Sequence, residues 1–189
     1  PQNTVGGFFG CMIENTNMVF TVSNSSNNGT INAYNSAGGF VGYGYDSINI
    51  TIAFENNINF GIITGSSYLG GFIGKIDYTN LTMIISNSLN NGNVTGSFMD
   101  LGGFIGKFDS RENTTLTISN SINNGIISGV NSYGRDAGGF VGTIYCNSNT
   151  TLTITNCTKN GMVTDAQKRD EGYTGGFIAK IYGRSNNGT

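Results

Sequence analysis

Asparagine is the residue type in this sequence whose spacing points most clearly to chemistry. The motif Asn-x-Ser/Thr, without Pro at x, is the acceptor for N-linked glycans, and it occurs nine times. Five copies occupy the same place in an internal repeat, just before an apolar run such as LTISN, while the residues around them vary. A glycan needs an exposed loop, and we expect such a loop here. The pattern therefore predicts N-glycosylation at Asn49, Asn80, Asn113, Asn149 and Asn187.

The other four motifs fall elsewhere in the repeat. Asn93, at the start of a short apolar run, and Asn28, in an Asn-Gly turn, are further candidates for glycosylation. The remaining two belong to the turn motif NSxNNG, or its variant NCTKNG, in which Asn favours turns and stacked Asn side chains can form ladders. We expect a buried structural ladder from Asn24, Asn87, Asn120 and Asn156.

The sequence has three cysteines, which weakly indicate an oxidising compartment. Cys146 and Cys157 lie in one repeat, on either side of a short loop, and could form a disulfide if their Cα atoms come within about 7 Å. The alternative is a pair of buried free thiols. Cys11 is left over, and could pair outside this segment or with a neighbouring copy.

The composition argues against several other kinds of chemistry. There is no His, the nine Lys and Arg residues form no basic stripe, and the formal net charge is −2. We therefore expect no nucleic-acid partner. No pair of carboxylates recurs at a fixed spacing, so we expect no catalytic residue, no metal site, and no cofactor apart from covalent glycans. No signal peptide or membrane-spanning segment is evident within these residues.

The chain is organised as an array of repeats. The triplet GGF begins at Gly6, Gly38, Gly70, Gly102, Gly138 and Gly175, which gives repeats of 32 to 37 residues. A period of this length is typical of solenoids and related arrays. We expect a single array over residues 1–189 with an incomplete last unit, which indicates a segment of a longer chain.

Each repeat contains three apolar, β-branched runs bounded by Gly and Asn, which is typical of strands. In the fourth repeat these runs are GGFIGKFD (102–109), LTISN (116–120) and GIISG (125–129). The pattern predicts a right-handed parallel β-helix with one coil of three short strands per repeat. Because side chains alternate along a strand, Leu116, Ile118 and Asn120 should point inward. Stacked coils should align a column of Phe8, Phe40, Phe72, Phe104, Phe140 and Phe177.

The run LGGFIGK…NLTMIISNSLNNGNVTGSFMDLGGFIGK (69–107) resembles the GLUG-type repeat of bacterial and protist surface proteins, with Phe in place of Leu after the glycine pair. The resemblance covers the whole chain. It implies a β-solenoid in a large extracellular adhesin or surface protein, but a shared fold does not supply an activity.

These observations predict a structural, N-glycosylated rod outside the cell or on its surface. We expect its partners to be copies of itself, or adjacent repeats of the same chain, stacked end to end into a fibre. One alternative is a carbohydrate- or host-binding adhesin stalk that uses Tyr68, Tyr133 and Tyr173 on the variable loops. Another is an ice-binding solenoid that uses the outward threonines Thr115, Thr117, Thr151, Thr153 and Thr155.

Overall fold

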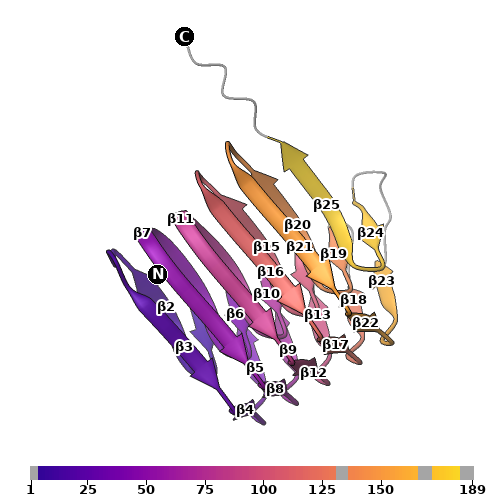
Figure 1. Ribbon diagram of the computed structural model, residues 1–189. Coiled ribbons are helices and arrows are strands. Elements are labelled where there is room, and N and C mark those ends of the chain that lie inside the picture. Colours follow the sequence, from indigo (N-terminus) through magenta and orange to yellow (C-terminus); the bar gives the residue numbers. More distant parts are fainter. Residues whose placement is uncertain (1–3, 131–135, 166–171, 184–189) are drawn as a thin grey trace.

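The structure is a computed structural model that describes residues 4–130, 136–165 and 172–183 (Figure 1). The chain winds into a β-solenoid of about five turns, and every pair of neighbouring strands is parallel. The predicted parallel solenoid is therefore confirmed. The residues that follow the GGF glycines are β-branched or aromatic, which suits them to this strand-rich architecture.

One coil crosses four sheets in succession, which we call the entry, long, corner and return sheets. The entry sheet contains β1 (Thr4–Gly6), β6 (Ser36–Gly38), β10 (Tyr68–Gly70), β14 (Leu101–Gly102), β19 (Ala137–Gly138) and β24 (Thr174–Gly175). The long sheet contains β2 (Phe9–Ile13), β3 (Val19–Ser23), β7 (Val41–Glu55), β11 (Ile73–Ser86), β15 (Ile105–Ser110), β16 (Thr114–Ser119), β20 (Val141–Cys146), β21 (Thr150–Thr155) and β25 (Ile178–Gly183).

The two remaining sheets are made of very short strands. The corner sheet contains β4 (Ser26–Asn27), β8 (Ile58–Asn59), β12 (Leu89–Asn90), β17 (Ile122–Asn123) and β22 (Thr158–Lys159). The return sheet contains β5 (Ile31–Ala33), β9 (Ile63–Gly65), β13 (Val94–Gly96), β18 (Ile127–Gly129) and β23 (Val163–Asp165). Each complete coil thus contains the three predicted runs, the first of which is divided between the entry and long sheets, and one additional corner strand of two residues.

The long sheet has two arms that enclose a hydrophobic core. In the second coil, β7 runs outward from Val41, bends near Asn49 and returns to Glu55 (Figure 1). The rings of Phe40 and Phe54, at the two ends of this excursion, lie 5.7 Å apart. Leu116 and Ile118 on the returning arm are fully buried, as predicted from the alternation of side chains.

The predicted phenylalanine column is also confirmed. Consecutive rings stack along the axis at centroid distances of 4.7 to 5.0 Å, close to the spacing of neighbouring strands. Phe40, Phe72, Phe104 and Phe140 are completely buried. The column therefore runs through the first core from end to end.

A second, smaller core lies between the entry and return sheets. It contains Ile31, Ile63, Val94, Ile127, Leu69 and Leu101 with three alanines. The glycine pair of each GGF lies next to this core, and a side chain is excluded at both of its positions except at Gly176 in the last coil. A Cβ on Gly70 would lie 2.1 Å from the carbonyl oxygen of Ile73, and one on Gly71 would lie 2.2 Å from that of Gly103. The repeated glycines are thus explained by close backbone packing, within a coil at the first glycine and between coils at the second.

Candidate functional site

The first candidate site is a row of asparagines at the bend between the two arms of the long sheet, which we call the outer ladder. Its members are Asn17, Asn49, Asn80, Asn113 and Asn149, all in the left-handed backbone conformation with φ between 44° and 58°. From Asn49 onward, each Nδ2 donates a hydrogen bond of 2.9 to 3.1 Å to the Oδ1 of the ladder asparagine in the preceding coil. Asn80 is half-buried and the other four are exposed.

The geometry of the bend explains why four of the predicted glycosylation sites fall in register. The residue two positions after each ladder asparagine points outward from the returning arm, and in four coils it is a threonine that completes the motif: Thr51, Thr82, Thr115 and Thr151. In the first coil Val19 takes this place, so Asn17 belongs to the ladder without forming the motif. The alignment thus follows from two stacked rows, one of Asn and one of Thr.

The predicted loop around these asparagines is only partly present. Asn49 and Asn80 lie within the continuous strands β7 and β11, whereas Asn113 and Asn149 immediately precede β16 and β21. Asn187 lies outside the described residues. The site is therefore a kink in a strand in two coils and a short connection in two others.

The remaining predicted asparagines lie on other edges. Asn28 and Asn93 are exposed, and the Oδ1 of Asn93 accepts a 2.9 Å hydrogen bond from the backbone N–H of Ile126. The prediction of a buried ladder is wrong for all four of its members, because each adopts a φ of 48° to 50° at a corner and is exposed: Asn24, Asn87, Asn120 and Asn156. The left-handed residue breaks the alternation of side chains there.

The buried ladder lies three residues further on and is formed by Asn27, Asn59, Asn90 and Asn123 in the corner sheet, which we call the inner ladder. Each of the first three donates from Nδ2 to the Oδ1 of the next coil at 2.8 Å. Each Nδ2 also contacts the carbonyl oxygen two residues later, as Asn90 does with Gly92 at 2.9 Å. The ladder ends at Lys159, which occupies the same position in β22.

All three cysteines are unpaired. The predicted bridge between Cys146 and Cys157 does not form, because Cys146 ends the outgoing arm whereas Cys157 follows the far end of the returning arm. Six residues of β21 separate these two levels, about 20 Å at about 3.3 Å per residue. Both thiols are half-buried against the first core, and burial raises the pKa of each, which favours the protonated thiol.

A second candidate site joins two acidic residues that sequence reasoning missed. Asp100 and Asp136 occupy equivalent positions before β14 and β19 and are only 8% and 7% exposed. The hydroxyl Oγ1 of Thr143 lies 2.9 Å from Oδ1 of Asp100 and 2.9 Å from Oδ2 of Asp136. A hydroxyl has one hydrogen to donate, so both contacts are satisfied together when one carboxyl is protonated.

The charges around this pair are mixed. Burial raises the pKa of Asp100 to about 6, an effect that the neighbouring Asp136 increases and the Thr143 hydrogen bond and Lys107 oppose. The Nζ of Lys180 lies 3.8 Å from Oδ2 of Asp136. The sequence pattern that could have identified this pair is that each aspartate lies two residues before the glycine pair of its repeat.

Tyrosine and lysine side chains gather beside this acidic pair, on the outgoing arm and at the start of the entry strands. We call them the tyrosine–lysine strip. Its lysine ammonium groups lie 4.3 to 5.3 Å from the tyrosine ring centroids, which is the range of cation–π contacts. The strip includes Tyr68 and Tyr173, two of the predicted adhesin residues, whereas Tyr133 lies outside the described residues. Its members are Tyr43, Tyr68, Lys75, Lys107, Tyr145, Tyr173, Lys180 and Tyr182.

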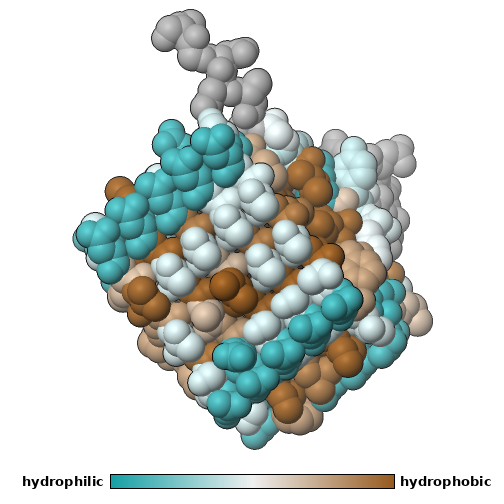
Figure 2. Space-filling model, in the orientation of Figure 1, coloured by the Kyte–Doolittle hydropathy of each residue, from teal (hydrophilic) through white to brown (hydrophobic). Residues whose placement is uncertain are grey.

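The outer face of the returning arm carries the predicted threonines in regular rows. Figure 2 shows paler rows of weakly polar side chains between two teal rows, all parallel to the stack of coils. One row contains Thr51, Thr82, Thr115 and Thr151. In the next rows, Ala53, Ile84 and Glu55 interrupt the threonines and serines. The hydroxyl face is therefore ordered but not uniform.

Comparisons with known proteins identified no relative. No protein-family model, no curated protein and no solved structure matches the chain. In the part of the chain that the structure describes, no three His, Cys, Asp or Glu side chains are grouped as a metal site would require. The same residues include no helix that could cross a membrane.

Proposed function

We propose that this chain is a structural segment of a secreted or surface-displayed, N-glycosylated fibre. The observation that supports this function best is the constancy of the cross-section. Rows of equivalent residues continue from coil to coil, as in the phenylalanine column with its spacing of 4.7 to 5.0 Å. A solenoid of this kind can be extended by adding coils without changing its contacts.

The described coils by themselves form a block (Figure 2). Five coils at about 4.8 Å each rise about 24 Å, while an arm of six residues is about 20 Å long. Only further coils, from the same chain or from another copy, would make this block a rod.

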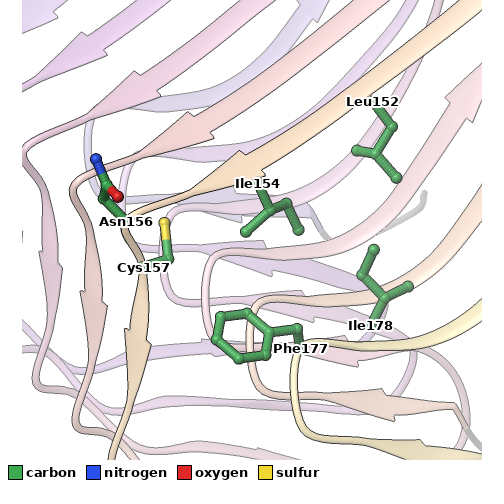
Figure 3. A pocket seen from close by; sticks show the side chains of 6 residues that line it. All are labelled: Leu152, Ile154, Asn156, Cys157, Phe177 and Ile178. Atoms are coloured by element: carbon green, nitrogen blue, oxygen red, sulfur yellow. The ribbon is translucent and has the colours of Figure 1, made fainter.

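The two end faces of the block are apolar, which favours such an extension. Ile181 in β25 is 54% exposed, whereas Ile76, Phe108 and Ile144 in the same row are fully buried. Beside it a cavity opens between Leu152, Ile154, Cys157, Phe177 and Ile178 (Figure 3). At the opposite end a similar cavity is lined by Phe9, Met12, Met18 and Phe20. These faces expose core positions that a further coil would cover.

Gly176 provides a specific test of the extension. An added Cβ would lie 2.0 to 2.3 Å from a glycine carbonyl oxygen of the following coil at each of the equivalent positions, Gly39, Gly71, Gly103 and Gly139. Nothing lies within 4 Å of such a Cβ at Gly176. Gly176→Ala should therefore leave the single molecule intact and block the addition of a coil.

The experiment compares the assembly of three proteins by negative-stain electron microscopy and light scattering over a range of concentrations. The unchanged protein should form linear assemblies. Gly183→Ala is the control and should assemble as well, because Cys146 occupies the equivalent position in the preceding coil and already carries a Cβ there. Gly176→Ala should remain monomeric and unfold at the same temperature as the unchanged protein at concentrations too low for assembly. Monomers of the unchanged protein at all concentrations, or normal assembly of Gly176→Ala, would overturn the proposal.

An adhesin stalk is the second candidate, and the tyrosine–lysine strip is the observation that favours it. Tyr173 is 54% exposed, and tyrosine rings combine an apolar face with a polar hydroxyl. Binding to a glycan array should then be lost in Tyr173→Ala. Tyr34→Ala is the control, because Tyr34 is 80% exposed and lies outside the strip. Equal binding by both variants would contradict this candidate.

A further inference from the structure

We propose that the asparagines of the outer ladder keep their ladder hydrogen bonds when they carry sugar, so that their glycans emerge in register from an unbroken row of amides. This inference rests on the proposed function, because it assumes N-glycosylation at Asn49, Asn80, Asn113 and Asn149. It assigns to these residues two roles at once, a structural role between coils and a role as attachment sites.

The direction of the hydrogen bonds carries the argument. Nδ2 of Asn49 donates to Asn17 in the preceding coil at 2.9 Å, while Oδ1 of Asn49 accepts from Asn80 in the following coil at 3.0 Å. Donor and acceptor of one amide thus point in opposite directions along the axis. Asn80 and Asn113 repeat this arrangement with their own neighbours.

A primary amide has two N–H bonds, and only one of them is antiparallel to its C=O bond. The ladder therefore uses that N–H, just as a peptide group does between strands. The second N–H, which lies beside the oxygen, takes no part in the ladder. It remains available for substitution.

An N-linked sugar replaces one hydrogen of Nδ2 and makes the amide secondary. Secondary amides strongly prefer the trans arrangement, in which the remaining N–H is antiparallel to C=O. The hydrogen that the sugar leaves behind is thus the one that the ladder needs. Glycosylation at Asn49, Asn80 or Asn113 is compatible with the hydrogen bonds on both sides.

The surroundings leave room for the sugar. Asn49, Asn113 and Asn149 are exposed, and the threonine of each motif points outward on the neighbouring arm. Coils stack about 4.8 Å apart, so first sugars on adjacent coils would lie in contact with one another. The stacked sugars would continue the ladder outside the protein.

The test uses two ways of removing the glycans from protein made in a eukaryotic secretory host. An endoglycosidase that leaves one N-acetylglucosamine preserves the secondary amide. An amidase that removes the whole glycan converts Asn to Asp, which replaces the donor by a negative charge. Intact-mass and glycopeptide analysis establishes which positions carried sugar before each treatment.

The one-sugar product should unfold within about 1 °C of the fully glycosylated protein, and the amidase product about 5 °C or more below it. The matched control is a protein in which Thr51, Thr82, Thr115 and Thr151 are replaced by Val, the residue already present at Val19. It retains bare amides, so the amidase should leave its unfolding temperature unchanged, although sugars at Asn28 or Asn93 are removed.

The possible failures are distinguishable. Absence of sugar at all four positions would overturn both this inference and the glycosylation in the proposed function, while leaving the assembly test with Gly176→Ala unaffected. Sugar at these positions, with the one-sugar product unfolding as early as the amidase product, would overturn this inference alone. So would equal unfolding temperatures of all three forms, because the ladder would then contribute nothing.

Discussion

Gly71 lies directly against the buried amide of Asn90, so that a Cβ on Gly71 would lie 2.4 Å from the Oδ1 of Asn90. The contact couples two features of the repeat, the second glycine of GGF and the inner ladder. Gly39 and Gly103 have the same relationship with Asn59 and Asn123. The second glycine of each pair is therefore needed for the amide row to pass between the two cores.

Gly71→Ala should reduce the free energy of unfolding by about 3 kcal/mol, the upper part of the usual range for overpacking a core. The new Cβ also meets the carbonyl oxygen of Gly103 at 2.2 Å, which is backbone and cannot rotate away. Denaturant unfolding of the monomer measures the change, with Gly176→Ala as the control. A loss below about 0.5 kcal/mol would show that the coils separate more easily than the structure indicates.

Lys159→Asn should stabilise the chain by about 1 kcal/mol, the net value of a typical hydrogen bond. Asn123 now donates to the carbonyl oxygen of Gly139 at 2.8 Å, and Lys159 occupies the next position of the inner ladder. An asparagine there would extend the amide row by one coil. Lys159→Ala removes the lysine without adding an amide, and equal stability of the two variants would contradict the prediction.

Asp100 should make the chain less stable as the pH rises. The pKa of Asp100 is about 6 in the folded protein against 3.8 for an ordinary aspartate, so the folded state holds the proton more tightly. Stability from this group is therefore complete below about pH 4 and is lost as the pH rises through 6, by about 3 kcal/mol in total.

The measurement is denaturant unfolding between pH 4 and pH 8 for the unchanged protein and for Asp100→Asn. The asparagine can donate to Oγ1 of Thr143 at every pH, which leaves that hydroxyl to bond Asp136. The decrease between pH 4 and pH 7 should thus be absent in Asp100→Asn and present in Glu55→Gln, an exposed control. Parallel pH profiles of Asp100→Asn and the unchanged protein would show that Asp100 is not the source of the pH dependence.

Phe104→Leu should cost about 2 kcal/mol, through lost volume and two lost ring contacts. Phe104 is completely buried, and its ring lies 4.7 Å from that of Phe72 and 4.9 Å from that of Phe140. Phe177→Leu should cost less than half as much, because Phe177 is 39% exposed and, among the described residues, its ring stacks only on that of Phe140. Equal costs measured by denaturant unfolding would mean that the column contributes only through burial.

Much of the fold could be predicted because equivalent residues recur at the same position in every repeat. The position of each GGF places Phe72 next to Phe104, and alternation along LTISN turns Leu116 and Ile118 inward. Both inferences need only the period of the repeat and the geometry of a strand. They fail at Asn120, where φ is 48° and the side chain turns outward.

The candidate sites were harder to predict, because they depend on how coils of unequal length meet. Asp100 and Asp136 are brought together although the connection before β19 is longer than the one before β14, because β14 and β19 still pair in register. Cys146 and Cys157 are separated because the chain turns back at the bend between β20 and β21. In the sequence this bend is indicated only by Asn149. The positions of the sequence-predicted asparagines were visible, but the hydrogen bonds that join them require the coordinates.

The parallel pairing of every strand gives the molecule a direction. The face with β2 and β3 cannot be superimposed on the face with β21 and β25, so contact between unlike faces is the one that continues the parallel pairing. Such contacts do not close into a symmetric pair but repeat without a stop. A filament built in this way would have a front and a rear, would grow differently at each, and would need a separate component to set its length.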